Sequence, residues 1–273
     1  MTLEILISTI DGGINKISEI ILPYRSDVKY IVSLQYQAEK YIPIPIDLIR
    51  EDVLVSQIPG KGVTKSRNNA LSLAVCDIGL FSDDDVSYTG EYLDKILKIF
   101  MTNPSLDVAI FKIKTPPECT EYKDYPLYPI KLSKLPFSVG TIEIAFRTKI
   151  IQDKQILFDE RFGAGQPLFI GSDENIFILD CIKKGLNVWF FPEYVVNHPY
   201  ESTIKSLQKY DIRRVSVGGA FDARINGWIS IPKTFWVMFK LLPDLIRNNK
   251  NPLIFMKERL SASIYILFTK SKK

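Results

Sequence analysis

The sequence predicts an α/β fold in which helices flank a mixed, mostly parallel central sheet. Three observations lead to this fold class. Short β-branched runs alternate with helical patterns through the first two thirds of the 273 residues, which is typical of βαβ units. Apolar residues make up 46% of the chain and charged residues 24%, as in an ordinary globular protein. No stretch reaches the roughly 18 uninterrupted apolar residues that a membrane-spanning helix needs.

The expected elements follow one another in the order that a βαβ chain requires. Helices are predicted where apolar residues recur at helical spacing, over residues 68–75, 91–100 and 173–184, the last of them ended by Gly185. β-Branched and aromatic runs predict strands over residues 3–9, 28–34, 53–57, 78–82, 107–113, 139–146 and 188–191. Residues 115–136 contain five prolines and three tyrosines, which predicts an ordered surface loop. In such sheets ligands bind beyond the carboxyl ends of the strands, so the polar residues there are the first site candidates.

Charge divides the chain near residue 222. Residues 1–222 carry 25 basic and 29 acidic side chains, whereas residues 223–273 carry 10 basic and 2 acidic ones. A protein that gripped nucleic acid through its main body would spread basic residues over that body, so the distribution argues against a nucleic-acid partner. We therefore predict a catalytic domain over residues 1–222 and a basic, apolar helical segment over residues 223–273.

The C-terminal segment changes character from Trp228 onward. It is apolar in blocks, is interrupted by Pro232, Pro243 and Pro252, and carries many basic residues. Two interpretations stay open. One is a pair of helices packed on the catalytic domain with Lys and Arg toward solvent. The other is an amphipathic helical extension on an anionic membrane surface, and both can hold at once.

The cysteines indicate the compartment. Cys76, Cys119 and Cys181 are odd in number and widely spaced, which predicts neither a disulfide framework nor a zinc knuckle. Glu4 stands where a secretory signal would carry positive charge, and the apolar run around it is short. We therefore expect a cytoplasmic location, with peripheral contact to the inner face of the cell membrane under the second interpretation of the C-terminal segment.

The sharpest local signal is the cluster Asp83, Asp84 and Asp85, directly after the expected strand at residues 78–82. Adjacent carboxylates repel one another, and their desolvation is costly unless a cation lies among them. Oxygen ligands at a strand end suit a hard divalent ion such as Mg²⁺ or Mn²⁺, which leaves coordination positions for phosphate oxygens. A solvated acidic turn or a helix cap is the alternative.

A second candidate is the segment GKGVTKSRNNAL at residues 60–71, between an expected strand and an expected helix. Its glycines allow a tight backbone path, Ser66 can cap the helix, and Lys65 and Arg67 lie near the positive helix N-terminus. Such a segment can hold a phosphate; otherwise it is an ordinary basic helix start. The spacing of a Walker A loop is missing, so ATP hydrolysis has no support.

Two further candidates lie later in the chain. The run FGAGQPLFIGSDENIF at residues 162–177 leads from glycines to Asp173 and Glu174 at an expected helix start. A carboxylate there is stabilised as an anion and can accept a proton, although acids also occur at helix starts for charge complementarity alone. His198, the only histidine, follows the last expected strand. A lone histidine is more often structural than a ligand, but this position favours a ligand.

Taken in order, these motifs resemble those of family-2-like glycosyltransferases of the GT-A fold, especially the small bacterial ones of capsule, O-antigen and exopolysaccharide clusters. The resemblance covers about residues 1–200. It is carried by LISTIDGGI, KSRNNAL, FSDDD, FDERFGAG followed by GSDENIF, and His198. It implies a Rossmann-like domain that binds a nucleotide sugar.

The resemblance also implies a role for each matched residue. Gln35 stands where the family commonly has an aspartate that reads the base, and the family's Glu-Asp pair is reversed here, with Glu174 at the position of the catalytic base. The implied contacts are Thr9 and Asp11 with the nucleotide base or ribose, Lys65 and Arg67 with the nucleotide or its diphosphate, Asp83 with the ribose or sugar, Asp84 with the donor, Asp85 with a divalent cation (Mn²⁺ or Mg²⁺), and His198 with that cation or the diphosphate. The reversed pair leaves open whether Asp173 or Glu174 is the base, and the matched position favours Glu174.

The implied activity is a metal-dependent, inverting glycosyltransferase of the hexosyltransferase type. It would move a sugar from a nucleotide-diphosphate donor to a saccharide or lipid-linked saccharide acceptor in bacterial surface polysaccharide synthesis. Two alternatives stay open. One is a sugar-phosphate nucleotidyltransferase, whose N-terminal glycine-rich signature IDGGINK matches poorly. The other is a non-catalytic subunit that binds a nucleotide sugar.

Overall fold

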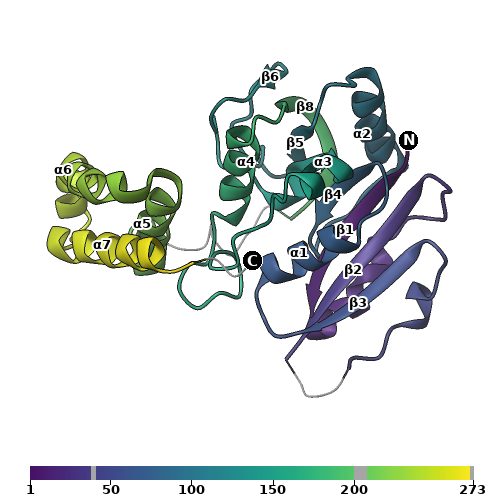
Figure 1. Ribbon diagram of the computed structural model, residues 1–273, viewed down its shortest axis with the longest axis horizontal. Coiled ribbons are helices and arrows are strands. Elements are labelled where there is room, and N and C mark those ends of the chain that lie inside the picture. The colour runs from purple at the N-terminus through teal and green to yellow at the C-terminus, as the bar shows by residue number, and fades with distance from the viewer. Residues whose placement is uncertain (38–40, 200–207, 271–273) are drawn as a thin grey trace. The chain divides into compact units, whose positions relative to one another are not determined.

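The computed structural model describes residues 1–37, 41–199 and 208–270, which belong to two compact units (Figure 1). The first unit comprises Met1–Phe158 and Phe177–Tyr200, and the second comprises Asp159–Ile176 and Glu201–Lys273. The boundary expected after residue 222 falls inside a helix of the second unit, α5 (Ile212–Asn226).

The first unit is built on a mixed sheet. The described strands pair in the order β3-β2-β1-β4-β7-β5-β8-β6. Pairing is parallel between β1 and β2, β1 and β4, β2 and β3, and β5 and β8, whereas β7 and β6 pair antiparallel with their neighbours. The mostly parallel sheet predicted from the sequence is thus confirmed. The strands are β1 (Leu3–Ile10), β2 (Val28–Tyr36), β3 (Val53–Pro59), β4 (Ile78–Ser82), β5 (Val108–Lys114), β6 (Ile130–Lys131), β7 (Ile144–Arg147) and β8 (Val188–Asn197).

Helices cover both faces of this sheet. One face packs against the 3₁₀ segment η1 (Asp11–Glu19) and α2 (Gly90–Thr102). The other packs against α1 (Val63–Leu73), α3 (Thr148–Asp153) and the part of α4 (Asp173–Lys183) that begins at Phe177. Short 3₁₀ turns occur at η2 (Ile46–Leu48) and η3 (Thr141–Glu143).

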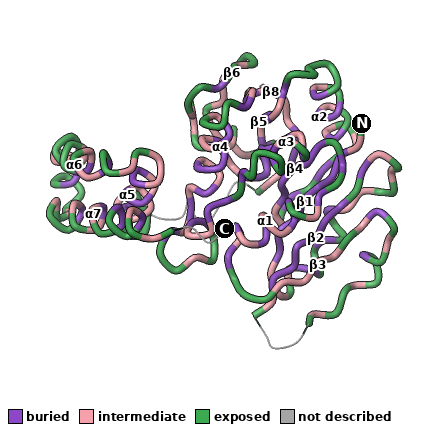
Figure 2. Tube along the Cα trace, viewed as in Figure 1, coloured by how far each residue is buried: buried purple, intermediate pink, exposed green. Residues whose placement is uncertain are grey.

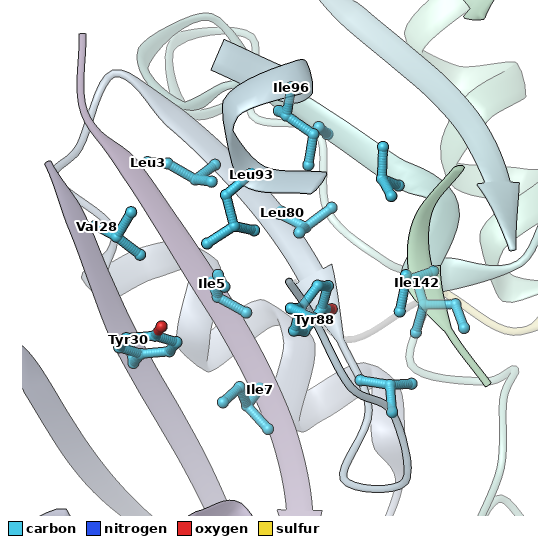
Figure 3. Packing of buried hydrophobic residues seen from close by; sticks show 14 of the residues in the cluster. Leu3, Ile5, Ile7, Val28, Tyr30, Leu80, Tyr88, Leu93, Ile96 and Ile142 are labelled. Carbon is cyan, nitrogen blue, oxygen red and sulfur yellow. The ribbon is translucent and has the colours of Figure 1, made fainter. Parts of the chain in front are cut away.

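Strand β1 lies between the two apolar layers. Alternate side chains of a strand point to opposite faces, and Leu3, Ile5 and Ile7 face the layer with α2. Figure 3 shows these three side chains beside Leu80 of β4 and Leu93 of α2. The opposite face carries a group of phenylalanines: Phe81, Phe146, Phe158 and Phe177. Burial on both faces explains why β1 is an almost continuous apolar run.

Helix α1 begins earlier than the sequence predicted. It starts at Val63 rather than at residue 68, after Gly62 with φ +124°. Ser66 consequently lies within the first turns and does not cap the helix, since its hydroxyl donates to the carbonyl of Ser33 on β2 at 2.8 Å. The hydroxyl therefore fastens α1 to the sheet.

The strand expected at residues 139–146 is shorter in the structure. Its first part is the turn η3, and only Ile144–Arg147 form β7. Glu143 is fully buried there and accepts hydrogen bonds from Lys123 and Tyr125, both at 2.5 Å, and from the backbone N–H of Gly140. Burial raises the pKa of Glu143 and outweighs the opposing effect of Lys123. These hydrogen bonds attach the proline-rich loop to the sheet at the place where backbone pairing of a strand was expected.

The described C-terminal region of the second unit is helical. A 3₁₀ turn η4 (Gly227–Ile229) leads into α6 (Ser230–Arg247), and α7 (Pro252–Phe268) follows. Pro232 interrupts nothing because it lies in the first turn of α6, where backbone N–H groups have no helical partner. Pro243 lies inside α6. None of the described helices is both long and apolar enough to cross a bilayer.

Helices α5 and α7 approach each other at a pair of glycines. A Cβ at Gly219 would lie 2.3 Å from the carbonyl oxygen of Arg259, so only glycine fits. The Arg259 guanidinium reaches back to Asp222 of α5, which also accepts from Lys233 of α6 at 2.5 Å. Backbone contact and a buried ion pair thus hold the three helices together.

Gly219→Ala should lower the free energy of unfolding by about 1–3 kcal/mol, because the methyl group meets the backbone of α7. Gly12→Ala is the control, because a Cβ there meets no atom within 4 Å, and a change below about 0.5 kcal/mol is expected. Urea unfolding followed by circular dichroism measures both variants. Equal stability of the two would contradict the close packing of α5 on α7.

Candidate functional site

Several strands of the first unit end at the same edge of the sheet. β1, β2, β3 and β4 run parallel, and because β4 and β5 are both antiparallel to β7, β5 and its parallel neighbour β8 run in the same direction. The residues after β1, β2, β4 and β8 therefore meet at one edge. Most residues that the sequence singled out lie there.

Asp83 is held by α1. Its carboxylate accepts from the Arg67 guanidinium at 2.9 Å, and Arg67 is only 4% exposed. The guanidinium also lies over the ring of Phe158, 5.5 Å from its centre. The structure thus brings two predicted donor-binding residues together as an ion pair on the α1 face of the sheet.

Asp84 is held by β1. It accepts a hydrogen bond from the Thr9 hydroxyl at 2.5 Å. Gly13 of η1 packs against this pair, since a Cβ there would lie 2.3 Å from Thr9 Oγ1 and 2.4 Å from Asp84 Oδ2. The hydrogen bond between β1 and the turn after β4 therefore requires glycine at this position.

Asp85 lies opposite His198, which directly follows β8. Asp85 Oδ1 and His198 Nε2 are 3.5 Å apart, and His198 Nδ1 is hydrogen-bonded to the carbonyl of Pro199. The hydrogen bond and positive charge of His198 lower the pKa of Asp85. Burial alone would lower the pKa of His198, but the hydrogen bond and charge of Asp85 outweigh it, and the pKa is raised. Tyr122 packs edge-on against the imidazole, with ring centres 5.7 Å apart.

Asp85 and His198 could hold a metal ion only together with ligands from outside the described residues. The residues that the structure describes contain no group of three or more His, Cys, Asp and Glu side chains able to hold a metal alone. Mg²⁺ and related ions commonly take one or two protein ligands and complete their coordination with substrate phosphates and water. One carboxylate and an imidazole whose other nitrogen is bound to a carbonyl fit such an ion.

Asp11, Gln35 and Lys65 occupy other parts of the same edge. Asp11 has φ +48° and accepts two hydrogen bonds from Gln37, at 3.0 and 2.9 Å, which lower its pKa. Gln35 is buried at the end of β2, and its Nε2 has no hydrogen-bond partner among the described residues. Lys65 donates to the carbonyl of Pro59 at 2.7 Å.

A cavity of about 690 Å³ adjoins this edge in the first unit. Asp84, Asp85 and His198 line it, together with Lys16 of η1 and Lys114 at the end of β5. Lys65 and Arg67, the expected diphosphate contacts, do not line it, and Lys16 and Lys114 are the basic side chains that do so in the described part of the chain. The sequence offered one signal for Lys114, its place at a strand end; Lys16 had none.

The proline-rich loop forms one wall of this cavity. Thr115, Pro116 and Pro117 line it directly. Farther along, the loop is fastened to β5 and β8 by Glu121, which accepts from Lys112 at 3.0 Å and from the hydroxyl of Tyr194. The ordered loop that the sequence predicted is therefore part of the cavity.

The acidic pair lies in the second unit, at the first turn of α4. A glycine-containing loop precedes it, in which the N–H of Gly163 donates to the carbonyl of Phe169 at 2.8 Å. Ser172, with φ +70°, leads into the helix. Asp173 is 2% exposed, whereas Glu174 is only partly buried.

No protein-family model matches the sequence, and no curated protein sequence is significantly similar to it. Solved structures of TarS from S. aureus are similar in fold. TarS 1–349 aligns with a TM-score of 0.55 at 14% identity, over 97% of this chain and 90% of that one. Its complex with UDP gives 0.53 at 15% identity, over 98% and 83%. Its complex with UDP-GlcNAc gives 0.52 at 14% identity, over 85% and 70%. The chain therefore has the Rossmann-like α/β fold of TarS.

Gly13→Ala should lower the free energy of unfolding by about 1–3 kcal/mol, because the methyl group would displace Thr9 or Asp84 and break their hydrogen bond. Gly12→Ala is the matched control, since a Cβ there meets no atom within 4 Å. It should change the stability by less than about 0.5 kcal/mol. Urea unfolding of both variants measures the difference. A Gly13 variant as stable as the Gly12 variant would show that the Thr9–Asp84 contact is not tight.

Proposed function

We propose that this protein is an inverting glycosyltransferase of the GT-A, family-2-like type. It would transfer a sugar from a nucleotide-diphosphate donor to a saccharide acceptor. One observation carries the proposal: Asp85 and His198 face each other at the carboxyl edge of the sheet and line a cavity of about 690 Å³. Sites of this volume hold small organic ligands.

The fold supports a nucleotide-sugar donor. The structures of similar fold include TarS complexes with UDP-GlcNAc and with UDP. Both ligands carry a diphosphate, and an open α/β sheet binds such groups beyond the carboxyl ends of its strands. We propose that this chain binds a nucleotide sugar at the corresponding edge.

Charge on the leaving diphosphate is the first requirement of the reaction. A divalent cation, Mn²⁺ or Mg²⁺, would be held by Asp85 and His198 and would supply positive charge to the diphosphate oxygens. Lys16 and Lys114 line the same cavity and can stabilise negative charge that develops as the sugar departs. Arg67 acts on Asp83, whose carboxylate it holds in place.

Recognition of the nucleotide is assigned to the ends of β1 and β2. The buried Nε2 of Gln35 has a hydrogen to donate and no acceptor in the described protein, so a base or ribose oxygen would satisfy it. Asp11 is fixed by Gln37 beside it. Thr9 and Asp84 shape the edge through their mutual hydrogen bond.

The catalytic base is assigned to Glu174. A base must reach the acceptor hydroxyl, and Glu174 is more exposed than Asp173, which is 2% exposed. In-line attack by the acceptor hydroxyl forms the new glycosidic bond, breaks the bond to the diphosphate and inverts the anomeric carbon. The acceptor class we propose is a lipid-linked saccharide of bacterial surface polysaccharide synthesis.

Asp85→Ala and His198→Ala should each reduce sugar transfer at least about 100-fold, because each removes a ligand of the proposed cation. Asp153→Ala, which removes an exposed carboxylate of α3, is the control and should retain full activity. Release of UDP from a panel of UDP-sugars that includes UDP-GlcNAc, with Mn²⁺ and mixed saccharide acceptors, is the assay. Wild-type turnover by a folded Asp85 variant would remove Asp85 from the site.

Glu174→Gln should lower kcat about 10²–10⁴-fold, because the amide cannot accept the proton of the acceptor. Binding of UDP, followed by the rise in melting temperature, should remain as in the wild type. Asp173→Asn is the paired variant and should lose less activity. The reverse order of the two losses would assign the base to Asp173.

A further inference from the structure

Helix α6 exposes an apolar stripe. Its exposed positions recur at helical spacing, and Trp236 and Phe239 on them are 60% and 65% exposed. Figure 2 shows exposed residues along α6 and α7. The apolar residues of the stripe are Pro232, Phe235, Trp236, Phe239, Pro243 and Ile246. An amphipathic helix normally buries its apolar side. α6 instead leaves this apolar stripe exposed and buries the opposite side, through Thr234, Met238 and Leu245.

The charges on the exposed side of α6 are positive. Lys240 and Arg247 are exposed beside the stripe, and the Lys240 ammonium lies 5.1 Å from the ring centre of Trp236. The single acid of α6, Asp244, is engaged by Lys209 at 2.6 Å and by the hydroxyl of Tyr210. Its negative charge is therefore already compensated.

Further apolar side chains are exposed on η4 and α7, the elements next to α6 in the chain. Trp228 of η4 packs edge-on against Phe268 at the end of α7, with ring centres 5.6 Å apart, and both are exposed. Leu253 and Ile254 are exposed at the start of α7. We call the exposed apolar residues of α6 together with Trp228 and Phe268 the aromatic face.

We propose that the aromatic face lies in the headgroup region of an anionic lipid bilayer. Trp, Phe and Ile would enter the acyl boundary, while Lys240 and Arg247 contact lipid phosphates. Because no described helix is long and apolar enough to span a bilayer, α6 would lie along the surface, where its 18 residues extend about 27 Å.

The positive charge beside the aromatic face favours an anionic lipid surface over a second copy of the chain as its partner. A two-fold dimer would place the same basic surface of both copies face to face. Lys240 and Arg247 are exposed beside the stripe, and the one acid of α6, Asp244, is paired with Lys209, so the two copies would bring like charges together. An anionic bilayer has the complementary charge. If the proposed function also holds, this contact brings the enzyme to a lipid-linked acceptor; the contact itself does not depend on that function.

The test is co-sedimentation of the full chain with phosphatidylglycerol vesicles and with phosphatidylcholine vesicles. The wild type should bind the anionic vesicles and lose binding at high salt. Trp236→Ser combined with Phe239→Ser should weaken binding about tenfold or more, because both rings leave the interface. Lys240→Gln and Arg247→Gln should each weaken it about fivefold.

Matched controls are available on the first unit. Leu127→Ser combined with Val75→Ser removes two exposed apolar side chains there, and Lys29→Gln combined with Lys98→Gln removes two exposed charges. All four sets of variants should keep the thermal shift produced by UDP, which reports on the proposed donor site. Failure of UDP to bind the wild type would count against the proposed function and leave the membrane contact standing.

Two results would overturn the membrane contact. One is wild-type protein that stays in solution with anionic vesicles at low salt. The other is a wild-type dimer, measured by light scattering, that Trp236→Ser combined with Phe239→Ser converts to monomer without affecting sedimentation. The second result would assign the aromatic face to self-association.

Discussion

Three carboxylates, those of Asp83, Asp84 and Asp85, follow one another at the end of β4. The side chains that contact them organise the candidate site. Asp83, directly after β4, reaches Arg67 of α1, and Asp84, in the turn that follows, reaches Thr9 of β1. Asp85, in the turn that follows, meets His198 after β8. The three carboxylates, which repel one another, thus each contact a different part of the fold: α1, β1 and the residue after β8.

These links connect the fold to the proposed chemistry. Asp83 and Asp84 contact Arg67 and Thr9, whereas Asp85 faces His198, and Asp84, Asp85 and His198 line the cavity. The buried Glu143 also links two parts of the fold, because its hydrogen bonds with Lys123 and Tyr125 fasten the proline-rich loop that forms one wall of the cavity. The acidic pair of α4 and the aromatic face both belong to the second unit.

The sequence predicted the described strands except the short β6, and it predicted the edge where the candidate site lies, because apolar runs and strand ends are local signals. β1 and β4 are buried on both faces, so their sequences are nearly continuous apolar runs that predict strands. Polar contacts across the fold are not local signals: Thr9 and Asp84 are 75 residues apart and meet only through the pairing of β1 with β4. Arg67 was therefore assigned to a diphosphate, while the structure pairs it with Asp83. Lys16 resembles any surface lysine until the fold places it at the cavity.

The most direct measurement is a crystal structure of the protein with Mn²⁺ and UDP, located by the anomalous signal of the metal. We predict one strong manganese peak within bonding distance of Asp85 and His198, with the diphosphate of UDP completing the coordination. A peak elsewhere, or UDP bound away from the edge formed by β1, β2, β4 and β8, would contradict the assignment of this edge as a nucleotide-sugar site.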